Sequence, residues 1–278
     1  MLAAAFWGAG DFLITLLTRR VGTRWALLSI QVLSLVCWIG ILLVHVQPVR
    51  ATPSLWGILL VTAVCHVAGL ALVYRAFEIG NLAIVSPISS AFAVVTAALA
   101  LATGERPPAL VLLGTAFLIA GVALATRAPS SGGPAPRPLR GVLEALLSAV
   151  AFGAMFWLFY FFVQPQLGYT VPLVSLKTMA VLGSALWFAR RSKDEPRAFR
   201  PLPIVLALAV GAALADTVAW LTYIEGTHTS YATVVTALAS LFSAVTVLLA
   251  WRFFRDRLAV HQWVGIGVIL LGILIVSV

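Results

Sequence analysis

The feature that most constrains this chain is a series of ten long apolar runs, each close to the length that a helix needs to cross a bilayer. The runs cover 2–18, 25–45, 54–75, 81–103, 107–126, 141–163, 172–189, 203–224, 229–251 and 259–278. Only helices or closed barrels satisfy their backbone in lipid, and these runs lack the polar–apolar alternation of barrel strands. The sequence therefore predicts an all-α polytopic membrane protein with ten transmembrane helices.

Composition excludes the soluble alternatives. The 278 residues include only 18 Lys/Arg and 9 Asp/Glu, and 62% are hydrophobic, whereas about a quarter of a soluble domain is charged. The net charge of +9 does not predict a nucleic-acid partner, because such binding needs the basic residues on one solvated face. Cys37 and Cys65 lie inside apolar runs, so we expect small buried hydrophobic residues in place of a disulfide or a metal site. We expect no cofactor.

The two halves of the sequence match each other in register. The aligned segments are 6–9 with 151–154, 29–31 with 175–177, 89–96 with 239–246, 105–106 with 256–257, and Gly114 and Gly121 with Gly265 and Gly272. We therefore predict two five-helix repeats, 1–126 and 141–278, joined by a Pro/Gly/Ser-rich linker at 127–140. Because each repeat has an odd number of spans, the two must be inverted, which is typical of secondary transporters with a midplane site.

The basic residues predict an orientation. The loops that follow odd-numbered spans carry 15 Lys/Arg, whereas the opposite side carries only Arg50 and Arg106. Cytoplasmic loops are enriched in Lys and Arg. We therefore expect a multi-pass protein of the plasma membrane (the inner membrane in bacteria), with both termini outside the cytoplasm.

Four short motifs resemble the EamA-type drug/metabolite transporter superfamily. They are Phe-Trp-Gly-Ala-Gly-Asp-Phe at 6–12, Tyr-Arg-Ala-Phe at 74–77, Val-Ser-Pro-Ile at 85–88 and Gly-Glu-Arg at 104–106, with weaker counterparts at 222–223 and 255–257. The resemblance implies ten helices in two inverted halves. It also implies a central cavity lined by spans one, three, four, six, eight and nine, with spans five and ten peripheral. The implied activity is movement of small metabolites or drugs, often outward.

Four ionisable residues stand well inside the spans: Asp11, His66, Lys177 and Asp216. Such groups are costly in hydrocarbon and usually face the bundle interior. Either aspartate could instead hydrogen-bond a neighbouring helix and fix the packing. His66, equivalent to Asp216 in the repeat, could carry protons or be a neutral structural residue. For Lys177 we favour a side chain that extends to the outer interface, and the alternative is a partner for an acid or a carboxylate substrate.

Aromatic residues accompany both acids. Trp7 precedes Asp11 by four residues, and Trp220 and Tyr223 follow Asp216 on one helix face. A carboxylate beside aromatic rings suits a cation or a proton. The predicted substrate-binding or proton-coupling residues are therefore Asp216, Trp220, Tyr223, Asp11, Trp7 and His66.

Hydroxyl residues follow the faces of spans four and nine. Ser86 and Ser90 flank Pro87, where span four can bend, and Thr236 and Ser240 lie in span nine. We place these four residues and Lys177 in a weaker, cavity-lining set. Small residues can instead serve close helix packing.

The function that these patterns favour is secondary transport by alternating access. The substrate would be a small metabolite or drug, with a cationic or zwitterionic, amino-acid-like compound favoured by the two acids, protons as the candidate coupling ion and export as the direction. The alternatives are a non-transporting receptor or assembly subunit, or an intramembrane enzyme, for which no zinc motif or nucleophile elbow is present. Expected partners are the substrate, protons and membrane lipids, with no nucleic acid and no required oligomer.

Overall fold

Nearly all of the described chain is helical, as the satisfaction of backbone polar groups in lipid requires. The computed structural model describes residues 1–45, 47, 49, 52–125, 140–190, 202–228, 232–254 and 259–276, and no strand occurs among them. The elements are α1 (Leu2–Val21), α2 (Thr23–Val44), α3 (Pro53–Ile79), α4 (Leu82–Ser89), α5 (Phe92–Ala102), α6 (Ala109–Ala125), α7 (Val142–Leu158), the π-helix η1 (Phe159–Val163), α8 (Gln164–Leu167), α9 (Thr170–Ala189), α10 (Leu202–Thr227), α11 (Ala232–Ala239), α12 (Phe242–Phe254) and α13 (Val260–Val276). The predicted all-α polytopic fold is confirmed.

Each of the ten predicted runs coincides with helix. Seven stretches of the described chain are long and apolar enough to cross a membrane: Thr23–Val44, Pro53–Ile79, Ile84–Ala102, Val142–Leu167, Thr170–Ala189, Pro203–Thr227 and Val234–Phe253. The remaining three runs form α1, α6 and α13. Ten crossings remain a prediction, and the linker predicted at 127–140 lies, except for Arg140, outside the described residues.

Predicted spans four and nine are each broken into two helices. α4 ends and α5 begins around Ser90, and α11 and α12 meet in the same way around Ser240. Pro87 alone does not explain the break, because span nine has no proline. The shared feature is the serine: Ser90 Oγ donates to the carbonyl of Pro87 and Ser240 Oγ to that of Ala237, each at 2.7 Å. These bonds compete with regular helix geometry at positions that the predicted repeat makes equivalent.

Two close helix crossings also occupy equivalent places. A Cβ atom at Gly8 on α1 would lie 2.6 Å from Val245 Cβ on α12, and one at Gly153 on α7 would lie 2.4 Å from Val95 Cβ on α5. Both contacts are too short for any side chain, so each crossing requires glycine. Each crossing thus pairs a helix of one half with a helix of the other.

A threonine joins each of these crossings. Thr246 Oγ1 donates to the carbonyl of Gly8 at 3.2 Å, and Thr96 Oγ1 donates to the carbonyl of Gly153 at 3.1 Å. Hydroxyl side chains at helix contacts supply such interhelical bonds in membranes. The α1–α12 and α7–α5 contacts therefore match in backbone approach and in hydrogen bonding.

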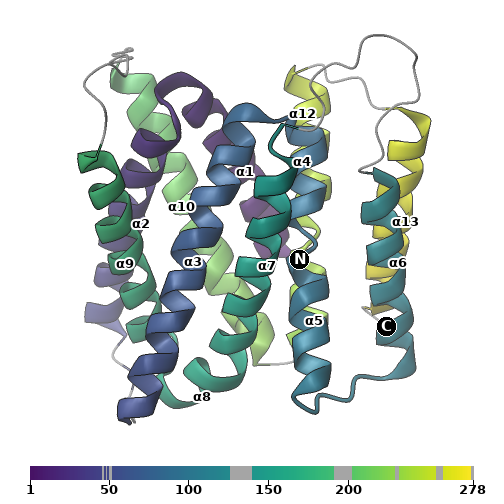
Figure 1. The fold of residues 1–278 in the computed structure, drawn as a ribbon, viewed down its shortest axis with the longest axis horizontal. Coiled ribbons are helices and arrows are strands. Elements are labelled where there is room, and N and C mark those ends of the chain that lie inside the picture. The colour runs from purple at the N-terminus through teal and green to yellow at the C-terminus, as the bar shows by residue number, and fades with distance from the viewer. Residues whose placement is uncertain are drawn as a thin grey trace.

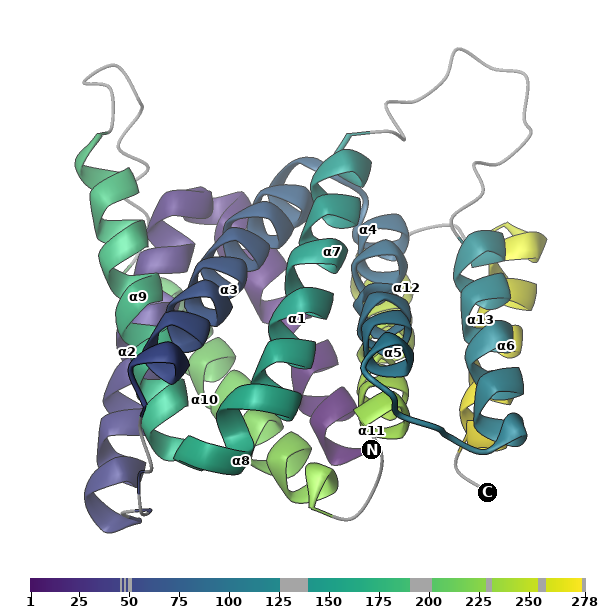
Figure 2. The ribbon, with the colours of Figure 1, turned by 60° about the horizontal axis from the view of Figure 1, so that its bottom comes forward.

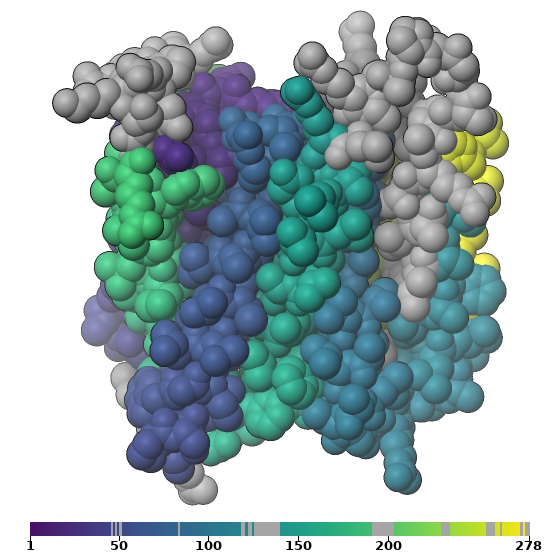
Figure 3. Space-filling view, viewed as in Figure 1, coloured from purple at the N-terminus to yellow at the C-terminus, as the bar shows by residue number. Residues whose placement is uncertain are grey.

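Helices α6 and α13 form a pair at one side of the molecule, as Figures 1 and 2 show. Their contact is close, since a Cβ atom at Gly121 would lie 2.7 Å from Ile269 Cγ1. This position agrees with the periphery that the resemblance implies for spans five and ten. At the opposite side, α2 packs against α9 and α10, and the side chains of α9, α3 and α7 form a continuous wall on the face seen in Figure 3.

Candidate functional site

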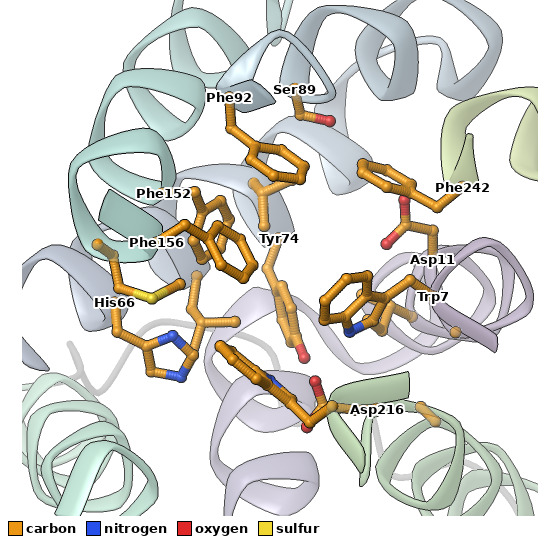
Figure 4. A pocket seen from close by; sticks show the side chains of 17 residues that line it. Trp7, Asp11, His66, Tyr74, Ser89, Phe92, Phe152, Phe156, Asp216 and Phe242 are labelled. Carbon is orange, nitrogen blue, oxygen red and sulfur yellow. The ribbon is translucent and has the colours of Figure 1, made fainter. Parts of the chain in front are cut away.

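A cavity lies between the helices of predicted spans one, three, four, six, eight and nine, the set that the resemblance implies. It offers a volume of about 90 Å³ to the centres of water-sized molecules, enough for several waters. Its walls are mainly apolar and aromatic (Figure 4). The lining residues are Trp7, Gly10, Asp11, Ile14, His66, Leu70, Val73, Tyr74, Ser89, Phe92, Phe152, Met155, Phe156, Ala212, Asp216, Trp220 and Phe242.

Five of the six residues of the predicted binding set line this cavity. They are Trp7 and Asp11 on α1, His66 on α3, and Asp216 and Trp220 on α10. The sixth, Tyr223, is not on the wall but packs one helical turn further along α10, against Trp7. The structure therefore brings together residues that are far apart in sequence and come from both predicted halves.

Asp11 is surrounded by hydroxyl groups. Ser86 Oγ donates to Asp11 Oδ2 at 3.4 Å. Thr246 Oγ1 lies 3.5 Å from the same atom and shares its single proton with the carbonyls of Gly8 and Phe242. Among the described residues, Asp11 forms no ion pair. Ser86 was predicted to line the cavity. It is not among the lining residues, and instead it hydrogen-bonds the carboxylate of Asp11. These long bonds leave the charge of Asp11 without a cationic partner in the described part of the chain.

Asp216 has a cationic partner in Lys177. Lys177 Nζ on α9 donates to Asp216 Oδ2 at 2.6 Å, and Ser34 Oγ on α2 donates to the same atom at 3.4 Å. The lysine side chain is 0% exposed, and that of the aspartate is 19% exposed. The favoured expectation that Lys177 extends to the interface is wrong, because a buried acid within reach stabilises its charge better than a long path to water.

His66 is a buried polar residue with no protein partner. Its relative exposure is 2%, and neither Nδ1 nor Nε2 has a hydrogen-bond partner among the described residues. Its ring packs near Phe152 and Trp220, with centroid distances of 6.2 and 6.4 Å. Phe152 comes this close because Gly69 has no side chain: a Cβ atom there would lie 2.8 Å from the ring.

Four aromatic side chains close one end of the cavity: Trp7, Phe156, Trp220 and Tyr223. Their ring centroids lie between 5.0 and 5.9 Å apart. Phe159, the first residue of η1, adds a fifth ring at 5.6 Å from Trp220. π-helical turns of this kind often mark functional positions. This aromatic cluster separates the cavity from the end of the molecule that holds α8.

The resemblance implied that span six lines the cavity, but sequence reasoning named none of the α7 residues that do so. Span six has no mid-span charge to attract attention, but the 145-residue repeat offset places Phe152 and Phe156 at the positions of Trp7 and Asp11. Applying that offset to the predicted site would have found both. Tyr74 was also missed, although it lies two helical turns after His66 on the same face of α3.

The remaining members of the weaker set do not lie on the cavity wall. Ser90 and Ser240 donate to backbone carbonyls at the two helix breaks, and Thr236 is fully buried. Ser89, next to the predicted Ser90, lines the cavity instead. Within the described residues, no group of three or more His, Cys, Asp or Glu could hold a metal ion.

Comparison with known proteins gives a family match over almost the whole chain. A family model described as the EamA-like transporter family matches residues 1–127 and 139–278. No curated protein matches significantly. Solved structures do match, 22 chains in all. One of them, titled only "Crystal structure of protein", has a TM-score of 0.69 and 15% identity, over 99% of this chain and 98% of that chain. At that identity the likeness shows the fold alone.

Proposed function

We propose that this chain, which belongs to the EamA-like transporter family and is therefore a membrane transporter of the drug/metabolite transporter superfamily, moves small organic cations by alternating access. Membership establishes a small-molecule substrate and a lipid environment. The cationic substrate, the coupling ion and the direction are our proposals.

The observation that carries the proposal is the charge balance of the cavity. Its only charged lining residues among those described are Asp11 and Asp216, and Lys177 already neutralises Asp216. One negative charge, on Asp11, is left to be compensated. A buried charge without a partner is costly, so a monovalent cation or a proton at Asp11 lowers the free energy of the site.

The surroundings of Asp11 favour an organic cation. Trp7 and Phe242 also line the cavity, and Figure 4 shows them beside the carboxylate. Aromatic faces attract cations and offer apolar contact that a hydrated inorganic ion does not use. A proton competes for the same carboxylate, so we propose proton exchange as the coupling reaction.

The matched helix crossings support movement of two halves about this site. The α1–α12 and α7–α5 contacts each join one half to the other, so a rocking motion can exchange which side is closed. The aromatic cluster of Trp7, Phe156, Trp220 and Tyr223 closes the side of α8, which the distribution of Lys and Arg predicts to be extracytoplasmic. Export, the direction that the family resemblance implies, completes the proposal.

Transport by the reconstituted protein tests the proposal. Thermal-shift screening identifies an organic cation that stabilises the wild type, and proteoliposomes preloaded with it are then given an inward or an outward proton gradient. In the wild type we expect the proton gradient to drive the organic cation against its own concentration gradient. We expect Asp11→Asn to lose this transport. Transport by Asp11→Asn at the wild-type rate would contradict the proposed site, and absence of transport by the wild type would contradict the proposed mechanism.

A further inference from the structure

The cavity has a second polar pole, distinct from Asp11. Figure 4 shows His66 and Asp11 on opposite sides of the cavity, with aromatic side chains between them. His66 belongs to α3 in the first half, next to Phe152 of the second half. Asp11 belongs to α1 and is supported by Thr246 of α12. A ligand that fills the cavity therefore meets a different chemical group at each end.

The imidazole of His66 belongs to the cavity wall but has no polar partner among the described residues. It is buried among aromatic rings, and neither nitrogen is bonded within the described part of the chain. Without a carboxylate partner, such a ring is held in its uncharged form, because a lone buried charge is costly. A neutral imidazole has one N–H donor and one nitrogen acceptor, and leaving both unused in a buried place is unfavourable. An uncharged hydrogen-bonding group on a ligand removes this cost.

The rings between the two poles stack on one another. Phe156 stacks on Trp220 with an interplanar angle of 28° and a centroid distance of 5.3 Å. Phe92 stacks on Phe156 at 26° and 4.9 Å. Phe92 and Phe242 lie almost parallel, at 11°. At these separations the rings pack against one another, so together they form an aromatic wall, along which a flat apolar body makes more contact than a branched one.

We infer that the substrate is an organic monocation whose flat apolar body carries an uncharged hydrogen-bonding group, such as a hydroxyl or carbonyl, at the end remote from the cation. The cation meets Asp11 and the neutral group meets His66. This inference rests on the proposed function and narrows its substrate class. It also separates monocations from zwitterions: a substrate carboxylate would find Lys177 already bonded to Asp216 and would remain uncompensated.

Matched amines test the inference on the purified full-length protein. The probes are 4-hydroxybenzylamine, tyramine and 4-(3-aminopropyl)phenol, each compared with the same amine lacking the hydroxyl, and tyrosine as the zwitterion. For at least one length we expect the hydroxyl to tighten binding roughly three- to tenfold, the value of one net hydrogen bond. We expect tyramine to bind more tightly than tyrosine.

Variants of His66 test whether its imidazole causes the preference for the hydroxylated amine. His66→Leu is expected to bring the affinity ratio of each pair to about one, and His66→Gln, which keeps a donor and an acceptor, to restore part of it. His45→Leu is the matched control, because His45 stacks on Tyr169 and does not line the cavity. It should leave the ratio at the wild-type value.

The outcomes separate this inference from the proposed function. Ratios near one at every length in the wild type, or an unchanged preference in His66→Leu, would overturn the inference while leaving an Asp11-dependent cation site intact. Equal binding of all amines to the wild type and to Asp11→Asn would overturn the proposed cation site itself. Tighter binding of tyrosine than of tyramine would overturn the monocation class.

Discussion

Asp11 and Asp216 are the same residue type on the wall of one cavity, but their partners differ in charge. Asp216 holds an ion pair with Lys177, whereas Asp11 has only hydroxyl donors from Ser86 and Thr246. The first carboxylate is compensated by the chain itself. The second is compensated only by something that enters. Two acids on the wall of one cavity therefore do not make a doubly charged site, and the partners of an acid decide whether it is free for exchange.

The largest expected effect comes from removing the ion pair that compensates Asp216. Lys177→Met leaves a partly buried carboxylate without its cation, and loss of one partner of a buried pair typically destabilises by about 3–5 kcal/mol. Because Asp216 reaches the cavity, we expect the lower end, about 3 kcal/mol. The measurement is the free energy of unfolding in mixed micelles.

The matched variants are Lys177→Met combined with Asp216→Asn, and Asp11→Asn alone. The double variant should regain most of the lost stability, because no charge is orphaned. Asp11→Asn should change stability by less than about 1 kcal/mol, since it removes no ion pair. A large loss in Asp11→Asn together with a small one in Lys177→Met would reverse the roles given to the two acids.

A smaller effect tests the comparison of the two glycine crossings, α1 with α12 and α7 with α5. Gly8→Ala and Gly153→Ala each insert a methyl group where a valine lies closer than 3 Å, and overpacking of this kind costs about 1–3 kcal/mol. We expect similar losses of thermal stability in the two variants. Gly40→Ala, where nothing lies within 4 Å, is the control and should be neutral or slightly stabilising. Unequal losses would contradict the structural equivalence of the crossings.

The smallest expected effects come from the two threonines at the crossings, and they distinguish a role in protein stability from a role in cation binding. Thr96→Val and Thr246→Val each remove one bond to a glycine carbonyl, and we expect each to cost about 1 kcal/mol of stability. Only Thr246 also donates to Asp11, so only Thr246→Val should change the affinity for an organic cation. Titration of both variants with phenethylamine measures this. An equal change of affinity in both would show that Thr246 acts on packing alone.

How much of the fold and of the site could be predicted from the sequence depends on whether a feature shows as a local or periodic pattern or arises only when distant helices pack. Apolar runs and the repeat are local or periodic, so they predicted the helices and five residues of the cavity wall. The pairing of Lys177 with Asp216 is not local: 39 residues separate them, and 182 separate Ser34 from Asp216. Which acid remains free depends on how α2, α9 and α10 pack. The breaks at Ser90 and Ser240 were missed because apolar content alone does not distinguish continuous helix from two half-length helices.

Calorimetric titration of phenethylamine into three proteins tests the central claim most directly: the wild type, Asp11→Asn, and the double variant Lys177→Met/Asp216→Asn. The double variant keeps one uncompensated negative charge in the cavity, and Asp11→Asn keeps none. We predict that the double variant binds within about threefold of the wild type, which is less than one net hydrogen bond, and that Asp11→Asn loses detectable binding. Wild-type affinity in Asp11→Asn, with binding lost in the double variant, would contradict the claim that Asp11 carries the exchangeable cation.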